Sequence, residues 1–134
     1  MTACNKVGLA GLRVLCVDDK QENLNAMLMF LDKWRVNVTT ALTPDEAMAA
    51  LIVCEPQVIL MDYHLDRDEN GLQLIAKMRK LLGYPIPAIL VTAKQNDEII
   101  TECFKANCSY LSKPLKPAKL RSLLQAVQVE GEKR

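Results

Sequence analysis

At 134 residues, half of them hydrophobic, the chain has the size of one ordinary domain and can bury a core without disulfides or structural metals. Its net charge of +1 lacks the basic excess that binding to nucleic-acid phosphates requires, so we expect no nucleic-acid partner. Five cysteines without a CxxC pair are typical of a reduced, cytosolic protein, and no apolar run approaches the length of a membrane span. These features predict a cytoplasmic domain without direct membrane contact.

In the first half of the chain, short apolar runs alternate with helical stripes. Residues 14–17 form a continuous apolar run that ends at an aspartate, which predicts a strand buried on both faces. The spacing i, i+3, i+4, i+7 then predicts a helix that buries Leu24, Met27, Leu28 and Leu31. Residues 36–41 are more polar, as in an edge strand. The next helix is predicted to begin with Thr43 as its cap and Glu46 at its third position, and to bury Ala47, Ala50, Leu51 and Cys54.

The second half repeats this alternation. Residues 58–61 and 88–91 are continuous apolar runs and predict two more buried strands, while residues 108–112 predict a polar edge strand. A looser helical stripe lies between the first two runs, at Leu72, Ile75, Met78 and Leu82. A short stripe precedes the edge strand, at Ile99, Ile100, Cys103 and Phe104. The last helix is opened by Pro117 and is predicted to bury Leu120, Leu123, Leu124 and Val127.

Five strands that alternate with five helices predict an α/β fold, a doubly wound five-stranded parallel sheet with helices on both faces. No linker, repeat or low-complexity stretch divides the chain. We therefore expect a single domain over residues 1–134, with its core at about residues 12–128.

Polar residues follow four of the predicted strands directly, where ligands bind in sheets of this kind. They are Asp18, Asp19, Asp62, Thr92 and Lys113. Each has a simpler explanation when taken alone, as a helix cap or a turn residue, but their joint placement favours a site. Clustered carboxylates repel one another by about 4 kcal/mol at 4 Å, so they need a bound cation, and hard oxygen ligands favour Mg²⁺, or else Mn²⁺. One carboxylate could then act as a nucleophile toward a phosphoryl group.

Four segments resemble the signature blocks of response regulator receiver domains, in the order that the family has them. They are residues 14–19 (VLCVDD), 60–62 (LMD), 90–93 (LVTA) and 110–114 (YLSKP). The resemblance implies a flavodoxin-like (βα)5 fold with strand order 2-1-3-4-5. It also implies Mg²⁺-dependent transfer of a phosphoryl group from a phosphohistidine, on a histidine kinase or a histidine phosphotransfer domain. Such a domain alone is not expected to be an enzyme, since it would only phosphorylate and dephosphorylate itself.

The resemblance also assigns roles to individual residues. Asp62 would be the phosphoacceptor and would bind the metal together with Asp19, while Asp18 would act mainly through water. The backbone carbonyl of His64 would complete the metal site. Thr92 and Lys113 would hold the phosphoryl group, Ala93 would leave room for it, and Tyr110 would be the aromatic switch that turns inward when Thr92 moves. A cis peptide is expected at Lys113-Pro114.

The loop after Asp62 departs from the family's pattern. The family has a proline four residues after the acceptor and a glycine eight residues after it, whereas here Asp66 stands at the first place and the first glycine is Gly71. The loop is one residue longer, and we interpret its acids, Asp66, Asp68 and Glu69, as a solvated tip. The His64 ring is expected to face solvent rather than to take part in catalysis.

Within the family, the closest resemblance is to receivers at the C-terminal end of hybrid sensor histidine kinases, through residues 9–15, Asn23, Lys33-Trp34 and residues 62–66. A stand-alone regulator is the alternative. A remote alternative is a Mg²⁺-dependent phosphatase with an aspartate nucleophile. Phosphatases that resemble the haloacid dehalogenase group carry an Asp-x-Asp pair after the first strand, whereas Asp18 and Asp19 are adjacent here. The oligomeric state is not predicted.

Overall fold

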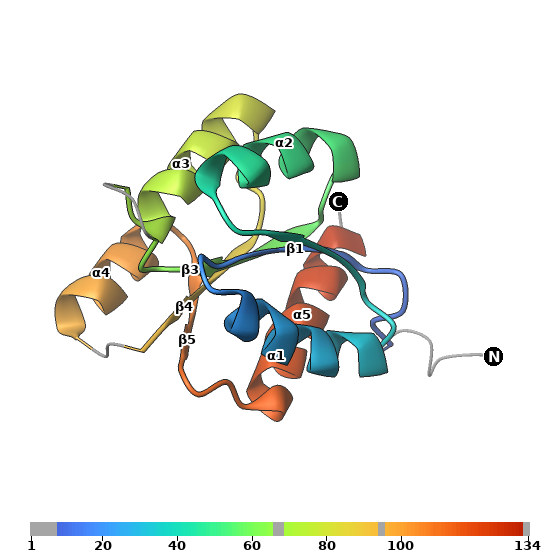
Figure 1. The fold of residues 1–134 in the computed structure, drawn as a ribbon. Helices are drawn as coiled ribbons and strands as arrows, with labels where there is room; N and C mark the ends of the chain where they lie inside the picture. Colours follow the sequence, from blue (N-terminus) through green and yellow to red (C-terminus); the bar gives the residue numbers. More distant parts are fainter. Residues whose placement is uncertain (1–7, 66–68, 94–95, 133–134) are drawn as a thin grey trace.

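The computed structural model describes residues 8–65, 69–93 and 96–132. Within these residues, strands and helices alternate from the first to the last (Figure 1): β1 (Arg13–Val17), α1 (Gln21–Lys33), β2 (Asn37–Ala41), α2 (Pro44–Cys54), β3 (Val58–Asp62), α3 (Gly71–Leu82), β4 (Ala88–Thr92), α4 (Asp97–Lys105), β5 (Ser109–Ser112) and α5 (Pro117–Glu132). All strand pairs are parallel, and the strand order is β2-β1-β3-β4-β5. This confirms the predicted doubly wound sheet. None of the described helices is both long and apolar enough to cross a bilayer.

The helices form two layers around the sheet (Figure 1). Helices α1 and α5 cover one face, and α2, α3 and α4 cover the other. Alternate side chains of β1 point to opposite faces, so that Val14 packs with the first layer and Leu15 with the second. The three central strands need apolar residues at successive positions because both of their faces are buried. This is why their sequences are continuous apolar runs.

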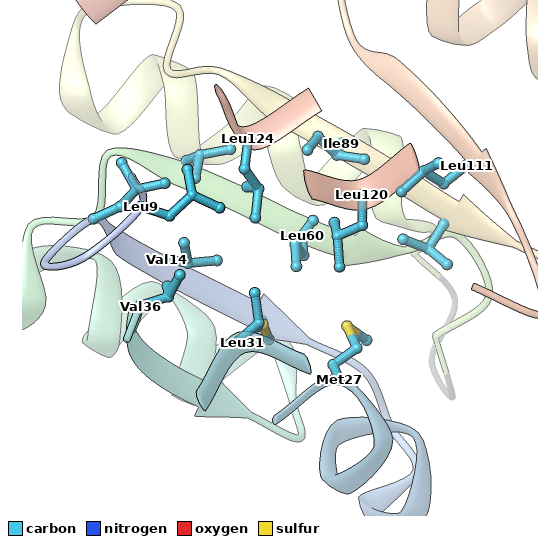
Figure 2. Packing of buried hydrophobic residues seen from close by; sticks show 14 of the residues in the cluster. Leu9, Val14, Met27, Leu31, Val36, Leu60, Ile89, Leu111, Leu120 and Leu124 are labelled. Atoms are coloured by element: carbon cyan, nitrogen blue, oxygen red, sulfur yellow. The ribbon is translucent and has the colours of Figure 1, made fainter. Parts of the chain in front are cut away.

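The core under α1 and α5 extends further toward the N-terminus than expected. Figure 2 shows Leu9 packed in this cluster, together with side chains from α1 and α5. Leu9 is 2% exposed, although the core was predicted to begin at about residue 12. A turn folds it inward, because the Leu12 amide donates to the Leu9 carbonyl at 3.0 Å and the Gly11 amide to the Arg35 carbonyl at 2.9 Å. The residues just before β1 are therefore part of the packed domain.

The predicted start of α2 is confirmed. The Thr43 hydroxyl accepts from the Glu46 amide at 3.1 Å, and the Glu46 carboxylate accepts from the Leu42 amide at 2.9 Å. The Glu46 amide, which has no partner within the helix, is thus satisfied by the Thr43 side chain, and the Glu46 side chain binds the backbone just before the cap. This fixes the entry of the chain into the helix.

The prediction for α4 was wrong at two of its four apolar positions. Ile99 and Cys103 are buried, but Ile100 is 41% exposed and Phe104 is 84% exposed. The helix has nine residues and rests on β5 at the edge of the sheet, so only one narrow stripe is covered. Ile100 and Phe104 lie one residue further around the helix and face away from the core.

Candidate functional site

The polar residues predicted from the sequence lie at the carboxyl edge of the sheet. Asp62 and Thr92 are the last residues of β3 and β4, and Lys113 directly follows β5. Asp18 and Asp19 follow β1, next to β3, where the chain order of the strands reverses. Ligands bind at such a reversal point because the connecting segments diverge there to opposite faces of the sheet.

Backbone hydrogen bonds extend the ladders beyond the strand ends and fix these residues. The Asp18 amide donates to the Ala41 carbonyl at 3.2 Å, and the Lys113 amide donates to the Thr92 carbonyl at 2.9 Å. Between them, the Tyr63 amide donates to the Val91 carbonyl at 2.9 Å. The site is therefore carried by the sheet itself, which limits how far its side chains can move.

Three carboxylates lie together at this edge. Asp18, Asp19 and Asp62 each offer an oxygen, and these oxygens all lie within 4.8 Å of one another. Asp18 is fully buried and Asp62 is 4% exposed, so solvent screens their repulsion poorly. The donor set consists of hard oxygens from carboxylates, which is the chemistry that Mg²⁺ prefers. These residues thus fit a divalent cation.

Lys113 places one ammonium group against the cluster. Its Nζ lies 3.0 Å from Asp62 Oδ1 and 3.4 Å from Asp18 Oδ2. Burial would lower the pKa of Lys113, but the hydrogen bond and the charge of Asp62, followed by Asp18, outweigh it and raise that pKa. Lys113 is therefore cationic at neutral pH. One positive charge facing three carboxylates leaves the site negative, which gives a further reason to expect a cation there.

The pKa of Asp62 reflects its burial and the negative charge gathered at this site. Burial, followed by the charge of Asp18, raises the pKa of Asp62 to about 6, although Lys113 acts in the opposite direction. The carboxylate is still mostly ionised at neutral pH and available as a nucleophile. Burial and Asp18 also raise the pKa of the adjacent thiol of Cys16 to about 12, so this thiol stays protonated and does not compete.

Asp18 is held in place by the start of α1. Its Oδ1 accepts from the Lys20 amide at 3.0 Å and from the Asn23 side-chain amide at 3.2 Å. Its Oδ2 faces Lys113. The sequence indicated Asn23 only through its resemblance to kinase-fused receivers, and its contact with Asp18 was not predicted.

Thr92 and Tyr110 lie on the same face of the sheet. Thr92 pairs with Ser112 and Leu90 pairs with Tyr110, so Thr92 and Tyr110 lie two register positions apart on neighbouring strands. Side chains two residues apart share a face, and here it is the face under α4. Thr92 is fully buried and Tyr110 is half-buried. The predicted Lys113-Pro114 cis peptide is present in the segment that follows.

The loop after β3 brings Gly71 against the site. The Gly71 amide donates to the Tyr63 carbonyl at 2.8 Å, and a Cβ on Gly71 would lie 2.3 Å from the Asp62 carbonyl oxygen. Position 71 therefore requires glycine, as the family's loop does, although the loop here is one residue longer. Asp66 and Asp68 lie outside the described residues. Glu69 does not form a solvated tip as expected, because it is paired with Lys77 of α3 and its side chain is 19% exposed.

The His64 side chain lies at the surface, against the ring of its neighbour Tyr63. The residue is exposed, and its ring packs edge-on against the Tyr63 ring with 4.9 Å between centroids. This agrees with a solvent-facing imidazole. The role of its backbone carbonyl stays a prediction.

The arrangement combines a buried carboxylate at the end of β3, two further acids after β1 that fit a cation with it, a threonine at the end of β4 and a lysine after β5. The family model of the response regulator receiver domain matches residues 14–125, which include all of these groups. The chain belongs to the response regulator receiver domain family. Receiver domains are signalling domains of two-component systems, and they interact with histidine kinases or phosphotransfer proteins.

Relatives and solved structures agree with this family. The chain is 27% identical over 117 residues to the transcriptional regulatory protein KdpE of Staphylococcus aureus, covering 87% of this chain and 49% of that protein. It is 29% identical over 119 residues to a 14.6 kDa protein of Leptolyngbya boryana, covering 87% of this chain and 90% of that protein. The chain thus spans about half the length of KdpE and most of the shorter relative.

Two solved structures have the same fold at comparable identity. The chemotaxis protein CheY4 of Vibrio cholerae superposes with a TM-score of 0.79 at 26% identity, covering 88% of this chain and 99% of that one. A CheY-like receiver domain protein of Methanospirillum hungatei gives 0.80 at 28% identity, covering 92% and 98%.

Proposed function

We propose that this receiver domain accepts a phosphoryl group on Asp62 from a phosphohistidine and thereby switches its surface. The observation that carries the proposal is the contact between Lys113 Nζ and Asp62 Oδ1 at 3.0 Å, inside a cluster of three carboxylates. A structural ion pair would need one acid, and the two additional buried or half-buried acids would only add repulsion. A site that binds a cation and an incoming phosphoryl group explains all of them.

In the proposed step, an Asp62 carboxylate oxygen forms a bond to phosphorus. The bond between phosphorus and the donor's imidazole nitrogen breaks, and the imidazole leaves with the bonding electron pair and takes up a proton from water. The Lys113 ammonium is placed to stabilise the negative charge on the phosphoryl oxygens. The Thr92 hydroxyl, at the end of the neighbouring strand, is placed to donate a hydrogen bond to one of them. Each group is supplied by a strand end, so little reorganisation is needed.

Asp19 and Asp62 would hold the metal directly, with the His64 carbonyl, and Asp18 would contact it through water. Bound Mg²⁺, or Mn²⁺, would supply positive charge that offsets the carboxylates and the phosphoryl oxygens. The hydrogen bonds that Asp18 accepts from Lys20 and Asn23 would keep its carboxylate oriented toward the proposed metal site.

Acetyl phosphate with Mg²⁺ should add the mass of one phosphoryl group to the protein, because the site positions its own acceptor and needs no protein donor. The Asp62→Asn variant should gain none, since its side chain keeps the size of aspartate but is not a nucleophile. Intact-mass spectrometry measures both. Asp32→Asn, an exposed acid on α1, is the matched control and should be labelled like the parent. Labelling that persists in Asp62→Asn would identify another nucleophile.

The same samples distinguish the domain from a phosphatase. A receiver domain takes up one phosphoryl group and releases it by slow self-hydrolysis. Repeated turnover of p-nitrophenyl phosphate that depends on Asp62 would instead support the enzyme alternative.

We further propose that Thr92 and Tyr110 couple the phosphorylated site to α4 and β5. Their shared face and neighbouring strands support this pairing, because a shift of Thr92 toward the phosphoryl group alters the space beside Tyr110. The domain would then shift between two arrangements of its α4, β5 and α5 surface.

Thr92→Ala should still be phosphorylated by acetyl phosphate, because the nucleophile and Lys113 remain. Phosphorylation should, however, change the hydrogen-exchange rates of residues 97–112 about fivefold less than it does in the parent. A factor of five corresponds to the lower end of ordinary coupling energies. Thr40→Ala, on the exposed edge strand β2, should respond like the parent. An undiminished response in Thr92→Ala would exclude Thr92 as the link.

Residues 1–134 are proposed to form one receiver domain, placed in the cytoplasm at the C-terminal end of a hybrid sensor histidine kinase, where it relays a phosphoryl group between histidines. A stand-alone regulator is the alternative. The resemblance of residues 9–15 to such receivers supports the first, and the burial of Leu9 and Leu12 makes this lead-in a structural part of the domain. A reading frame that starts and stops around these residues would contradict the fusion.

A further inference from the structure

The outer side of α2 is apolar, although it faces solvent. Residues 47–54 (AMAALIVC) include no charged residue, so this part of the helix is apolar on every side. Ala47 and Leu51 are buried in the core, whereas Ile52 is 63% exposed and Val53 is 80% exposed. A helix that is apolar all round is expected to be covered all round. The described part of the chain covers α2 on one side only.

Helix propensity gives no reason for the two exposed residues. Isoleucine and valine are β-branched and lose side-chain freedom in a helix. A helical position that only faces water favours alanine, lysine or glutamate instead. Ile52 and Val53 gain little burial in return for this loss. Two such side chains next to each other indicate a contact with another molecule.

The neighbouring helix α3 continues this surface. Helices α2 and α3 contact each other on the same face of the sheet (Figure 1). Both run from the carboxyl edge of the sheet to the opposite edge, because each leads from the end of one parallel strand to the start of another. Leu81, in the last turn of α3, and Tyr84, just after it, are exposed like Ile52 and Val53. We call the exposed side chains of residues 45–53 and 76–84 the α2–α3 surface.

The charges of the α2–α3 surface are divided between the two helices. Asp45 and Glu46 are exposed on α2, which has no basic residue. Lys77 and Lys80 are exposed on α3, which has no acidic residue. Lys77 is paired with Glu69, just before the helix. One helix is therefore acidic and its neighbour basic.

The charges at the far end of α2 offset each other. Glu55 directly follows the helix, and Arg13 Nε donates to the Glu55 carbonyl at 2.8 Å. Both residues are exposed. This end of α2 thus has no net charge, and the first turn gives the helix its acidic character.

We propose that the α2–α3 surface pairs with the same surface of a second copy of this chain, so that α2 of each protomer lies on α3 of the other. A partner that fits this surface needs a basic helix opposite α2 and an acidic helix opposite α3, side by side. The chain itself has this pair of helices, and a two-fold axis parallel to them brings the pairs together. Contact of α2 with α2 would instead join acids to acids, which lowers affinity. The proposal goes beyond the proposed function and does not depend on it.

Apolar contacts provide the affinity in this pairing. With the axis parallel to the helices, the last turns of α2 and α3 meet, so Ile52 and Val53 of one protomer contact Leu81 and Tyr84 of the other. Ala49, one turn earlier on α2, is exposed and small. It lets the helices approach to the separation of about 8–10 Å that packed helices adopt. These turns lie at the edge of the sheet remote from the carboxylate cluster, so pairing leaves that site open.

Sedimentation equilibrium of the intact chain measures the pairing. The average mass should rise with concentration from the 15.0 kDa of one chain toward twice that value. Concentrations up to about 1 mM cover the weak association expected of a small interface. Val53→Glu should raise the dissociation constant about tenfold or more, because it puts a charge into the apolar centre of the contact.

Two variants at exposed apolar positions elsewhere are the controls. Phe104→Glu lies on α4 and Met29→Glu on α1, and these side chains are 84% and 67% exposed. Both variants should associate like the parent, since neither position belongs to the α2–α3 surface. Circular dichroism shows that each variant is folded.

Charge exchange tests the arrangement of the helices. Lys80→Glu puts an acid opposite the acids of α2 in the other protomer, and Asp45→Lys puts a base opposite the bases of α3. Each change occurs twice in a symmetric dimer, so each variant alone should associate about fivefold more weakly. A mixture of the two should associate like the parent, because one contact keeps its original charges and in the other the new lysine faces the new glutamate.

A parent that stays monomeric up to about 1 mM would overturn the proposal, since even weak specific association is measurable there. Association that Val53→Glu leaves unchanged would overturn it as well. So would association that Phe104→Glu or Met29→Glu weakens equally, because the contact would then lie on another face. A mixture of Lys80→Glu and Asp45→Lys that associates no better than either variant alone would exclude the pairing of α2 with α3.

Discussion

Replacing Gly71 with alanine is expected to lower the free energy of unfolding by about 3 kcal/mol, the upper part of the ordinary range for overpacked sites. The added Cβ would lie 2.3 Å from the Asp62 carbonyl oxygen and 2.8 Å from Met61 Cγ. The first contact is with backbone at the end of β3, which cannot give way without moving Asp62. Labelling of Asp62 by acetyl phosphate should also slow by about a hundredfold, since a displacement of about 1 Å has that effect on positioned groups.

Gly83→Ala is the control at the other end of the same helix. Gly83 has a φ of +79° and no atom within 4 Å of an added Cβ, so alanine there is strained without a collision. We expect a loss of about 1 kcal/mol and unchanged labelling. Denaturant titration and initial labelling rates measure both variants. Alanine is a better helix former than glycine, so a Gly71→Ala protein that is as stable as the parent would show that β3 and the loop before α3 relax around it.

Most of the fold could be predicted from the sequence because the central strands are buried on both faces. Residues 14–17, 58–61 and 88–91 have no polar position, which fits a parallel sheet covered on both sides. Each run is followed by a polar residue, and parallel strands bring those ends to one edge. The meeting of Asp18, Asp62 and Thr92 at one edge therefore followed from these three strand assignments, and Lys113 was added by the predicted edge strand at residues 108–112.

Other features depend on distances that a sequence does not contain. In α4, Ile99 and Ile100 are equally apolar, and only the position of the helix on β5 decides which one is buried. Gly71 was recognised as the first glycine of an unusual loop, but its close approach to Asp62 depends on the path of that loop.

Without metal, Asp62→Asn should be more stable than the parent at pH 7.5. Unfolded chains ionise this carboxyl near its ordinary pKa of 3.8, whereas in the folded domain burial and Asp18 raise the pKa to about 6. Below about pH 4 the carboxyl is neutral in both states, and above about pH 6 it is ionised in both. The folded state then bears the whole cost of the buried charge, about 1.4 kcal/mol per pKa unit, or about 3 kcal/mol.

Asparagine keeps an oxygen that can accept from Lys113 but carries no charge, so it removes this cost. The stability advantage of Asp62→Asn should therefore approach about 3 kcal/mol above pH 6, shrink as the pH falls toward 4, and vanish below it. Urea unfolding of both proteins across this pH range, in the presence of a chelator, measures the difference. Asp32→Asn should differ from the parent by no more than about 0.5 kcal/mol at any pH, because Asp32 is exposed.

Adding Mg²⁺ should reverse the order of the two proteins. A ligand that binds only the folded state stabilises it in proportion to the logarithm of its concentration over its dissociation constant, and the parent offers one more carboxylate to the ion. The parent should thus gain stability steadily with Mg²⁺ concentration, while Asp62→Asn gains less. If the parent were already the more stable protein in chelator at pH 7.5, the repulsion among these carboxylates would be too weak to require a cation. The case for the metal would then rest on the identity of the ligands alone.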